Sequence, residues 1–241
     1  MSKKVVLVAD DLGLSSEINR AIVHGHVDGA LDAACLMMGQ PGTGEAVELA
    51  RAHPSLEVGW HLHLCDSQPV TAERWPWGAS PARAGWSLGL SRAARELARQ
   101  EIGRQWELFR VTRLPCRFVN CHHHLHAHPF VYQTLLETIG PDFAGWIRLG
   151  SLRTMDGSFR PAQRIAFALA NLFQYRRRAR SRLPSPDTLW GVDRIFRMDA
   201  AEVRATVADL PDGWHEFLFH PRTLSCQDTL CLTALRSSRS S

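Results

Sequence analysis

Short apolar segments alternate with amphipathic segments about seven times along this chain, and this alternation restricts the fold more than any other feature. The first apolar segment, residues 5–9, is rich in valine, as expected for a strand buried on both faces of a parallel sheet. Ser15 is a suitable N-cap for the helix expected next, which carries Ile18 and Ile22 on one face. Repeated strand–loop–helix units predict an α/β fold, and their number favours an irregular, incomplete (β/α) barrel over a doubly wound sheet.

The remaining predicted elements follow the same order. Further strands are expected at residues 31–38, 56–64, 117–122, 145–149, 188–192 and 216–219. Further helices are expected at residues 45–52, 90–111, 130–139, 163–178 and 199–210. A Trp-, Pro- and Gly-rich connection at residues 66–87 lacks periodicity and is typical of a loop over an active site. We predict one domain over residues 1–225 and a disordered or truncated tail over residues 226–241.

The composition excludes several classes of protein. With 45% hydrophobic and 22% charged residues, the chain is not of the disordered class. No apolar run approaches the ~20 residues that cross a bilayer, and the run before Asp10 is shorter than a signal-peptide core, so we expect a cytoplasmic protein. No glycine-rich phosphate loop follows the first strand, which argues against nucleotide binding. The 6 cysteines contain no CxxC pair and are expected to be buried thiols.

Acidic, histidine and arginine side chains fall where the predicted strands end. In a βα barrel these strand ends share one face, so we expect the side chains to converge on one mouth. The residues are Asp10, Asp11, His61, His122, Arg148 and His220.

A histidine-rich segment follows the fourth predicted strand, with 5 histidines between residues 122 and 128. In extended backbone, His122, His124 and His126 would lie on the same side of the chain. Neutral imidazole is a common ligand of divalent metals, so this segment predicts a metal site.

Four motifs together resemble the YdjC-like carbohydrate deacetylases. They are Ala-Asp-Asp-Leu-Gly-Leu-Ser at residues 9–15, Val-Gly-Trp-His-Leu-His-Leu at residues 58–64, Val-Asn-Cys-His-His-His-Leu-His at residues 119–126, and Phe-His-Pro at residues 219–221. The resemblance extends from about residue 4 to residue 222. That family includes chitooligosaccharide deacetylases and a branch associated with hopanoid biosynthesis.

The resemblance implies a hydrolase, a metal-dependent N-deacetylase on a distorted barrel of the polysaccharide-deacetylase kind. It implies that Asp11, His61 and His122 bind the metal. Asp10 would then be the general base and His220 the general acid. For substrate binding, the expected residues are His124, His126 and Arg148, and Arg148 is also expected to pair with Asp10.

One divalent metal ion is the expected cofactor. Two imidazoles and one carboxylate suit zinc, cobalt or nickel, while the resemblance also allows magnesium. The expected substrate is an N-acetylated amino sugar, either a chitooligosaccharide or a sugar on a lipid. Three segments, residues 20–26, 119–122 and 210–216, make the hopanoid-associated branch the closer resemblance.

An arginine-rich segment at residues 176–182 follows a predicted apolar stripe formed by Ile165, Leu169, Leu172 and Phe173. One interpretation is a peripheral contact with an anionic membrane at the inner surface. The other is an outer barrel helix that packs this stripe on the core. Nucleic-acid binding by the arginines is a third reading, but no recognition motif accompanies them, and we expect no nucleic-acid partner.

Two further interpretations of the metal motifs stay open. An Asp-His-His set also serves other amidohydrolases and phosphoesterases, because the ligands do not encode the bond that is cleaved. The second interpretation is that the chain is a family member that binds a metal but does not catalyse a reaction. Family members continue beyond the His-Pro motif, so we expect incomplete barrel closure here.

Overall fold

The central sheet contains 8 parallel strands in the order β5-β4-β3-β2-β1-β8-β7-β6. The computed structural model describes residues 2–155 and 161–236, and for residues 161–170 it describes mainly the helical backbone. The strands are β1 (Lys3–Leu12), β2 (Ala33–Leu36), β3 (Glu57–Leu62), β4 (Phe118–Cys121), β5 (Trp146–Ile147), β6 (Ser151–Leu152), β7 (Thr188–Trp190) and β8 (Gly213–Phe219).

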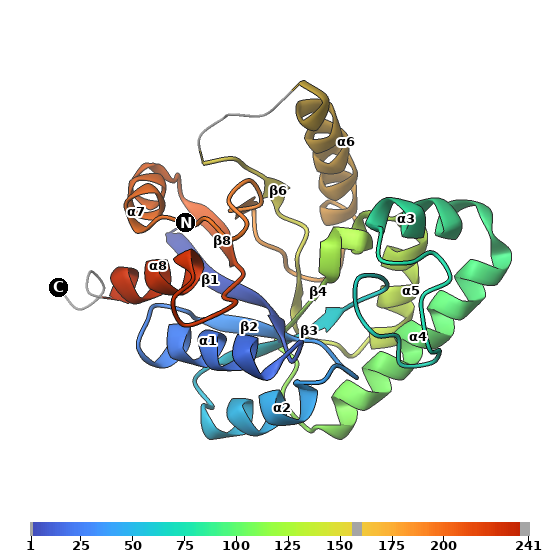
Figure 1. The fold of residues 1–241 in the computed structure, drawn as a ribbon. Coiled ribbons are helices and arrows are strands. Elements are labelled where there is room, and N and C mark those ends of the chain that lie inside the picture. The colour runs from blue at the N-terminus through green and yellow to red at the C-terminus, as the bar shows by residue number, and fades with distance from the viewer. Residues whose placement is uncertain (1, 156–160, 237–241) are drawn as a thin grey trace.

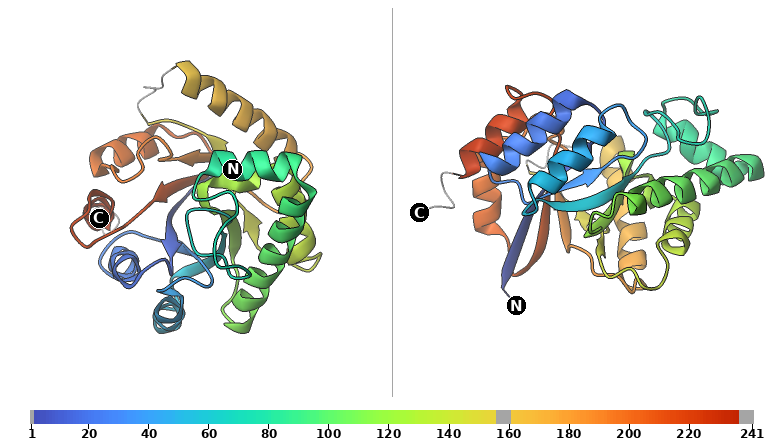
Figure 2. Two further views of the ribbon diagram at one scale, coloured as in Figure 1. Left: turned by 45° about the vertical axis from the view of Figure 1, so that its right-hand side comes forward. Right: turned by 90° about the horizontal axis from the view of Figure 1, so that it is seen from below.

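Helices surround this sheet on its outer side (Figures 1 and 2). They are α1 (Ser16–Val27), α2 (Thr43–Ala52), α3 (Pro81–Leu90), α4 (Arg92–Val111), α5 (Pro129–Ile139), α6 (Pro161–Arg178), α7 (Ala200–Asp209) and α8 (Gln227–Arg236), with the short turn η1 (His122–Ala127) after β4. None of these described helices combines the length and the apolar character that a membrane crossing requires.

The strand order is that of a barrel opened between β5 and β6. Strands that follow one another in the chain are paired, except β5 and β6, which form the two edges of the sheet, and β1 also pairs with β8. The backbone N–H of Ile147 donates to the carbonyl of Pro184, and the N–H of Leu149 donates to the Ser185 hydroxyl, so an irregular segment occupies this gap. The predicted irregular, incomplete barrel is therefore confirmed.

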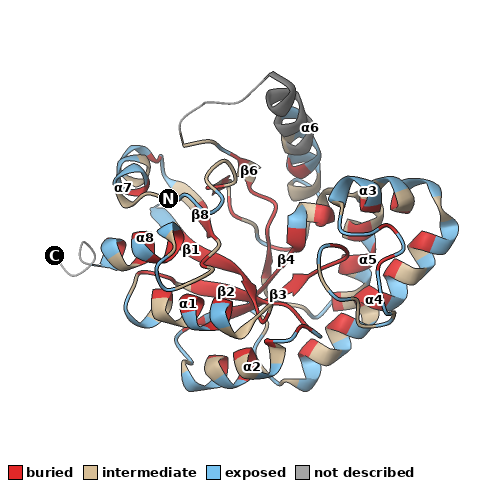
Figure 3. Ribbon diagram, viewed as in Figure 1, coloured by how far each residue is buried: buried red, intermediate tan, exposed pale blue. Residues whose placement is uncertain are grey.

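Both faces of the sheet are buried, as the apolar strands predict (Figure 3). One face packs on the helices, and the other forms a smaller interior cluster that includes Val8, Phe118 and Trp146. The Phe118 and Trp146 rings stack with centroids 4.4 Å apart. A Cβ at Gly59 would lie 2.6 Å from the Phe118 ring, so only glycine fits beside it. These rings fill the interior below the polar end of the strands.

The C-terminal segment corrects one prediction. Residues 227–236, expected to be disordered or truncated, form the helix α8, and residues 237–241 lie outside the described part of the chain. Cys231, Leu232 and Leu235 are buried, and the carbonyl of Leu232 accepts from the N–H of Ala30. These apolar side chains recur at helical spacing, and the surrounding serines and arginines obscured that period.

Two other segments differ from the sequence prediction. The second part of the connection at residues 66–87 belongs to helix α3, where the Ser80 hydroxyl accepts from the N–H of Arg83 and Pro81 begins the helix. In α6, Leu172 and Phe173 are 45% and 46% exposed, so these two members of the predicted apolar stripe do not pack on the core. The side chains of Ile165 and Leu169 lie outside the described part of the structure.

Candidate active site

The candidate site lies at the carboxyl ends of the parallel strands. A bulge brings the two consecutive aspartates of β1 to it: the register against β2 shifts between Ala9 and Leu12, and Asp11 has a φ of 70°. Successive residues of a regular strand point to opposite faces, whereas a bulge adds a residue and turns its side chain. Asp tolerates this left-handed backbone better than most residues. Both carboxylates can therefore serve one site.

Asp10 is held by the buried guanidinium of Arg148, which follows β5. Arg148 Nη1 donates to Asp10 Oδ2 at 2.7 Å, and Nη2 donates to Oδ1 at 2.9 Å. Arg148 Nε donates to Glu216 Oε1 at 2.7 Å, so the cation lies between two buried carboxylates. Burial by itself would raise the pKa of Asp10, but Arg148 and, less strongly, His61 hold it far below its usual value. Burial raises the pKa of Glu216.

The second aspartate lies against two imidazoles. Asp11 Oδ1 is 3.0 Å from His122 Nδ1 and 3.4 Å from His61 Nε2, and these two nitrogens are 3.4 Å apart. All three residues are buried. Burial would raise the pKa of Asp11, but the neighbouring His122 and His61 hold it well below its usual value.

These three side chains fit a divalent metal ion. Each offers one ligand atom, and the three atoms lie within 4.8 Å of one another. Both Asp11 oxygens are buried, and neither makes a well-formed hydrogen bond within the described residues. The guanidinium of Arg222 lies 3.6 Å from Asp11 Oδ2. Buried carboxylate oxygens are normally closely paired, so a metal ion is a suitable further partner for them. One carboxylate and two imidazoles are also a common donor set for zinc.

The histidine-rich segment does not have the predicted extended conformation. Residues 122–127 form the turn η1, in which His123 and His124 have φ values of 52° and 53°. Alternation along a strand therefore does not place His122, His124 and His126 on one side, and that expectation is wrong.

The members of this segment have separate environments. His123 Nε2 lies 3.1 Å from Asp66 Oδ2, and His128 caps α5 by accepting from the N–H of Phe130. The rings of His124 and His126 are 6.0 Å apart. His124 Nδ1 and both ring nitrogens of His126 are buried without a hydrogen bond to any described residue. Burial, reinforced by Arg148, lowers the pKa of His126 to about 3.

His220 follows β8 and approaches the same group of residues from the other end of the chain. Its backbone N–H donates to Asp228 Oδ2 at 2.7 Å, which anchors this turn to α8. Its Nδ1 is buried and makes no hydrogen bond within the described residues. Burial lowers the pKa of His220, while the nearby Asp10 and Asp11 oppose that shift. Thus the strand ends and the turn η1 bring the residues predicted from the motifs to one region, and their roles stay predictions.

Sequence reasoning missed four buried polar residues of this site, namely Cys35, Asn120, Glu216 and Asp228. Three of them carry a period-two signal, because each lies two residues after a side chain of the interior cluster: Cys35 after Ala33, Asn120 after Phe118, and Glu216 after Trp214. Side chains two apart on a strand share a face. Asp228 lacked such a signal because its helix was not predicted.

Comparison with known proteins identifies the family of the chain. The family model described as YdjC-like protein matches residues 4–238. The chain belongs to the YdjC-like family. The resemblance stated from the motifs is thereby confirmed at the level of the family.

This YdjC-like chain has relatives that are named carbohydrate deacetylases. One from Brevibacillus brevis is 35% identical over 136 residues, covering 56% of this chain and 54% of the relative. One from Vibrio vulnificus is 36% identical over 128 residues, covering 52% and 51%. The chain thus matches about half the length of these curated relatives.

A solved structure supports the fold. The crystal structure described as a putative cellobiose-phosphate cleavage protein from Enterococcus faecalis aligns with a TM-score of 0.66 and 17% identity. The alignment covers 100% of this chain and 95% of that chain. At this identity the likeness concerns the fold alone.

Proposed function

We propose that this YdjC-like protein is a metal-dependent hydrolase that removes the N-acetyl group from an N-acetylated amino sugar. The single observation that carries the proposal is the buried Asp11–His61–His122 group with Asp10 and His220 beside it. The carbohydrate deacetylases among the relatives support the choice of bond and substrate class.

Asp11, His61 and His122 would hold the metal ion. A divalent ion at these ligands would lower the pKa of a water molecule and polarise the acetyl oxygen. The donor set favours zinc, cobalt or nickel over magnesium, which prefers more oxygen ligands.

Asp10 and His220 would move the protons. Asp10 Oδ2 accepts one hydrogen bond, from Arg148, and therefore keeps a lone pair for a proton taken from water. His220, in its cationic form, would protonate the leaving amine, and Asp10 and Asp11 favour that form.

The remaining predicted residues have separate roles in this proposal. Arg148 is 1% exposed and bonded to two carboxylates, so we assign it to the orientation of Asp10 and not to substrate binding. His124 and His126 have buried nitrogens that make no well-formed hydrogen bond within the described residues, which suits hydrogen bonds to the sugar or its acetyl group.

Metal analysis tests the ligand assignment. The wild-type protein should bind one divalent ion per chain, and His61→Ala and His122→Ala should each lose most of it. His53→Ala, at the end of α2, is the matched control. Unchanged stoichiometry in both ligand variants would refute the site.

A finer proposal concerns the carrier of the sugar. On α6, Tyr175 is 69% exposed next to the exposed Leu172 and Phe173. Arg176 on the same helix and Arg180 in the turn after it are exposed as well. An apolar patch bordered by arginines suits an anionic membrane surface. We therefore favour an amino sugar linked to a lipid, as in the hopanoid-associated branch, with peripheral contact at the inner membrane.

Vesicle sedimentation tests this contact. The protein should sediment with anionic vesicles at low salt, and neutral substitution of Arg176 and Arg180 should abolish binding. Arg177 is unsuitable, because it donates to the His126 carbonyl and supports η1. Absence of vesicle binding, combined with efficient deacetylation of chitooligosaccharides, would favour the water-soluble substrate instead.

A further inference from the structure

Asn120 and Cys35 lie between the carboxylate of Asp10 and the imidazole of His61. We infer that Asn120 is a positioning residue, which holds the His61 ring with the hydrogen on Nδ1 and with Nε2 directed to the proposed metal site, and that Cys35 packs beside this contact. This inference deepens the metal-dependent function proposed above and rests on it.

The argument begins at Asp10. Arg148 bonds to both of its oxygens, and the charge of the guanidinium keeps the carboxylate ionised. An ionised carboxylate only accepts hydrogen bonds. Every other group that contacts Asp10 closely must therefore offer a hydrogen.

Asn120 meets this requirement with its amide nitrogen. Its Nδ2 donates to Asp10 Oδ1 at 3.1 Å, which leaves its Oδ1 facing His61 Nδ1 at 2.6 Å. If the amide were reversed, two acceptor oxygens would lie against each other at Asp10. The charge of Asp10 thus selects one orientation of the Asn120 amide.

The amide orientation then determines the proton on His61. Asn120 Oδ1 is an acceptor, so His61 Nδ1 must carry a hydrogen and donate to it. A neutral His61 ring therefore has its lone pair on Nε2, the atom that lies 3.4 Å from both Asp11 Oδ1 and His122 Nδ1. This is the nitrogen required at the proposed metal site.

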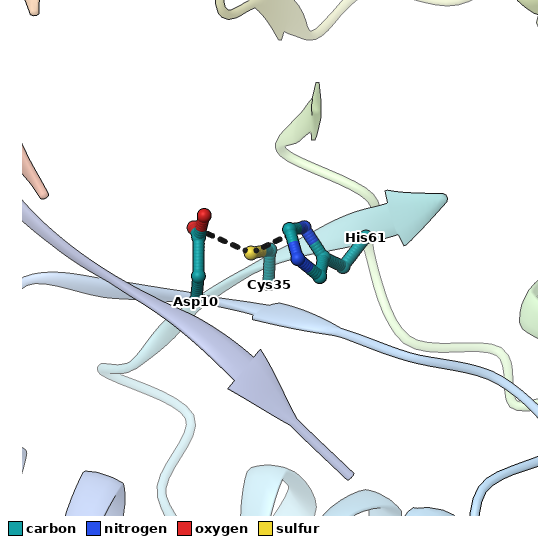
Figure 4. Close-up of side chains that lie close together, drawn as sticks. All are labelled: Asp10, Cys35 and His61. Carbon is teal, nitrogen blue, oxygen red and sulfur yellow. Dashed lines mark hydrogen bonds between the residues drawn. The ribbon is translucent and has the colours of Figure 1, made fainter. Parts of the chain in front are cut away.

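Cys35 occupies the space left beside these groups (Figure 4). Its Sγ donates to Asp10 Oδ1 at 3.0 Å and lies 3.1 Å from His61 Nδ1. Asn120 Nδ2 donates to the same sulfur at 3.3 Å. Asp10, Cys35 and His61 also resemble a ligand set for a metal, but an ion there would face the cation of Arg148, so we assign the thiol to packing and hydrogen bonding.

Two substitutions at Asn120 distinguish the role of its amide nitrogen, which donates to Asp10, from that of its amide oxygen, which accepts from His61. Asn120→Leu removes donor and acceptor and should weaken Co²⁺ binding by about 10- to 100-fold, the usual effect of losing an outer partner of a metal ligand. Asn120→Asp keeps an acceptor for His61 but places a second carboxylate beside Asp10. It should retain more Co²⁺ affinity than Asn120→Leu and lose acetate release.

Cys35→Ala provides the comparison within the site, because it leaves the Asn120–His61 bond intact. It should change Co²⁺ affinity less than Asn120→Leu. Cys231→Ala, which removes an equally buried thiol on α8, controls for the lost volume. Co²⁺ absorption spectra and thermal unfolding report binding and folding without any assay of turnover.

Two results would overturn the inference: wild-type Co²⁺ affinity in folded Asn120→Leu, or equal loss of affinity in Asn120→Leu and Asn120→Asp. If the wild-type protein bound two ions per chain and Cys35→Ala bound only one, Cys35 would belong to a second metal site, and this result would also contradict the inference. Wild-type protein that binds Co²⁺ but releases no acetate would refute the proposed function, while the affinities would still test Asn120.

Discussion

Adjacent aspartates in β1 have different partners, and this difference assigns their roles. Asp10 makes two hydrogen bonds with the buried guanidinium of Arg148, whereas Asp11 contacts two imidazoles and, at 3.6 Å, the partly exposed guanidinium of Arg222. A base and a metal ligand can be separated by substitution if the change at Asp10 keeps an acceptor oxygen for Asn120, which links Asp10 to His61.

Asp10→Asn keeps a carbonyl oxygen that can accept from Asn120, so it should retain the metal, and it should lose most acetate release because it removes the base. General-base catalysis commonly contributes about 10²- to 10⁴-fold, so a loss in this range is expected. Metal content and the rate of acetate release should be measured on the same sample. Asp11→Asn is the comparison, since it should lose both. Near-normal turnover by Asp10→Asn would contradict the assignment of the base.

His126 should make folding stability dependent on pH. Its folded pKa of about 3 lies below the usual value of 6.5, because burial and Arg148 disfavour the cation. Between these values the unfolded chain binds more protons, so stability falls as pH decreases from about 6.5, by up to about 1.4 kcal/mol per pH unit for this group. Urea unfolding at pH 7.5 and 5.0 should show a smaller pH effect in His126→Gln. The same dependence in both proteins would argue against a neutral buried His126.

At the scale of elements, α8 connects the site to the outer layer of helices. Its Asp228 accepts from the backbone of His220, and its Leu232 packs against Gly25 of α1, where a Cβ would lie 2.9 Å from the leucine. The helix therefore supports the turn that carries the proposed acid.

Leu232→Ala should destabilise the protein by about 2–5 kcal/mol, the range for truncating a fully buried leucine. Leu230→Ala is the matched control on the same helix, because Leu230 is 52% exposed and its loss should stay within about 0.5 kcal/mol. Chemical unfolding of the two variants measures the difference. Equal stability of both would show that α8 does not pack as described.

Sequence patterns predicted elements well where one period continued through a segment. The strands at Val8 and His61 and the cap at Ser15 follow from apolar runs and capping chemistry, and the structure contains them. The two-residue alternation of side chains is interrupted at the β1 bulge and at the left-handed residues of η1. At these places the directions of the Asp11 and His124 side chains could not be predicted from the sequence.

At the scale of the whole molecule, the open barrel explains why residues distant in sequence share one site. Asp10 and Arg148 are 138 residues apart in the chain, and Arg148 and Glu216 are 68 apart, yet each pair forms a buried hydrogen bond. The strand count and motif order predicted this convergence. Specific contacts such as Asn120 with His61 depend on the register between β3 and β4, which no local pattern encodes.

Metal removal and restoration test the central claim most directly. Purified protein should be assayed for acetate release from N-acetylated glucosamine oligosaccharides and from a lipid-linked N-acetylglucosaminide, before and after chelation and after stoichiometric return of Zn²⁺ or Co²⁺. The account predicts acetate release from at least one substrate, its loss on chelation and its recovery with one ion per chain. Release that persists in metal-free protein, or no release from either substrate by fully metal-loaded protein, would contradict it.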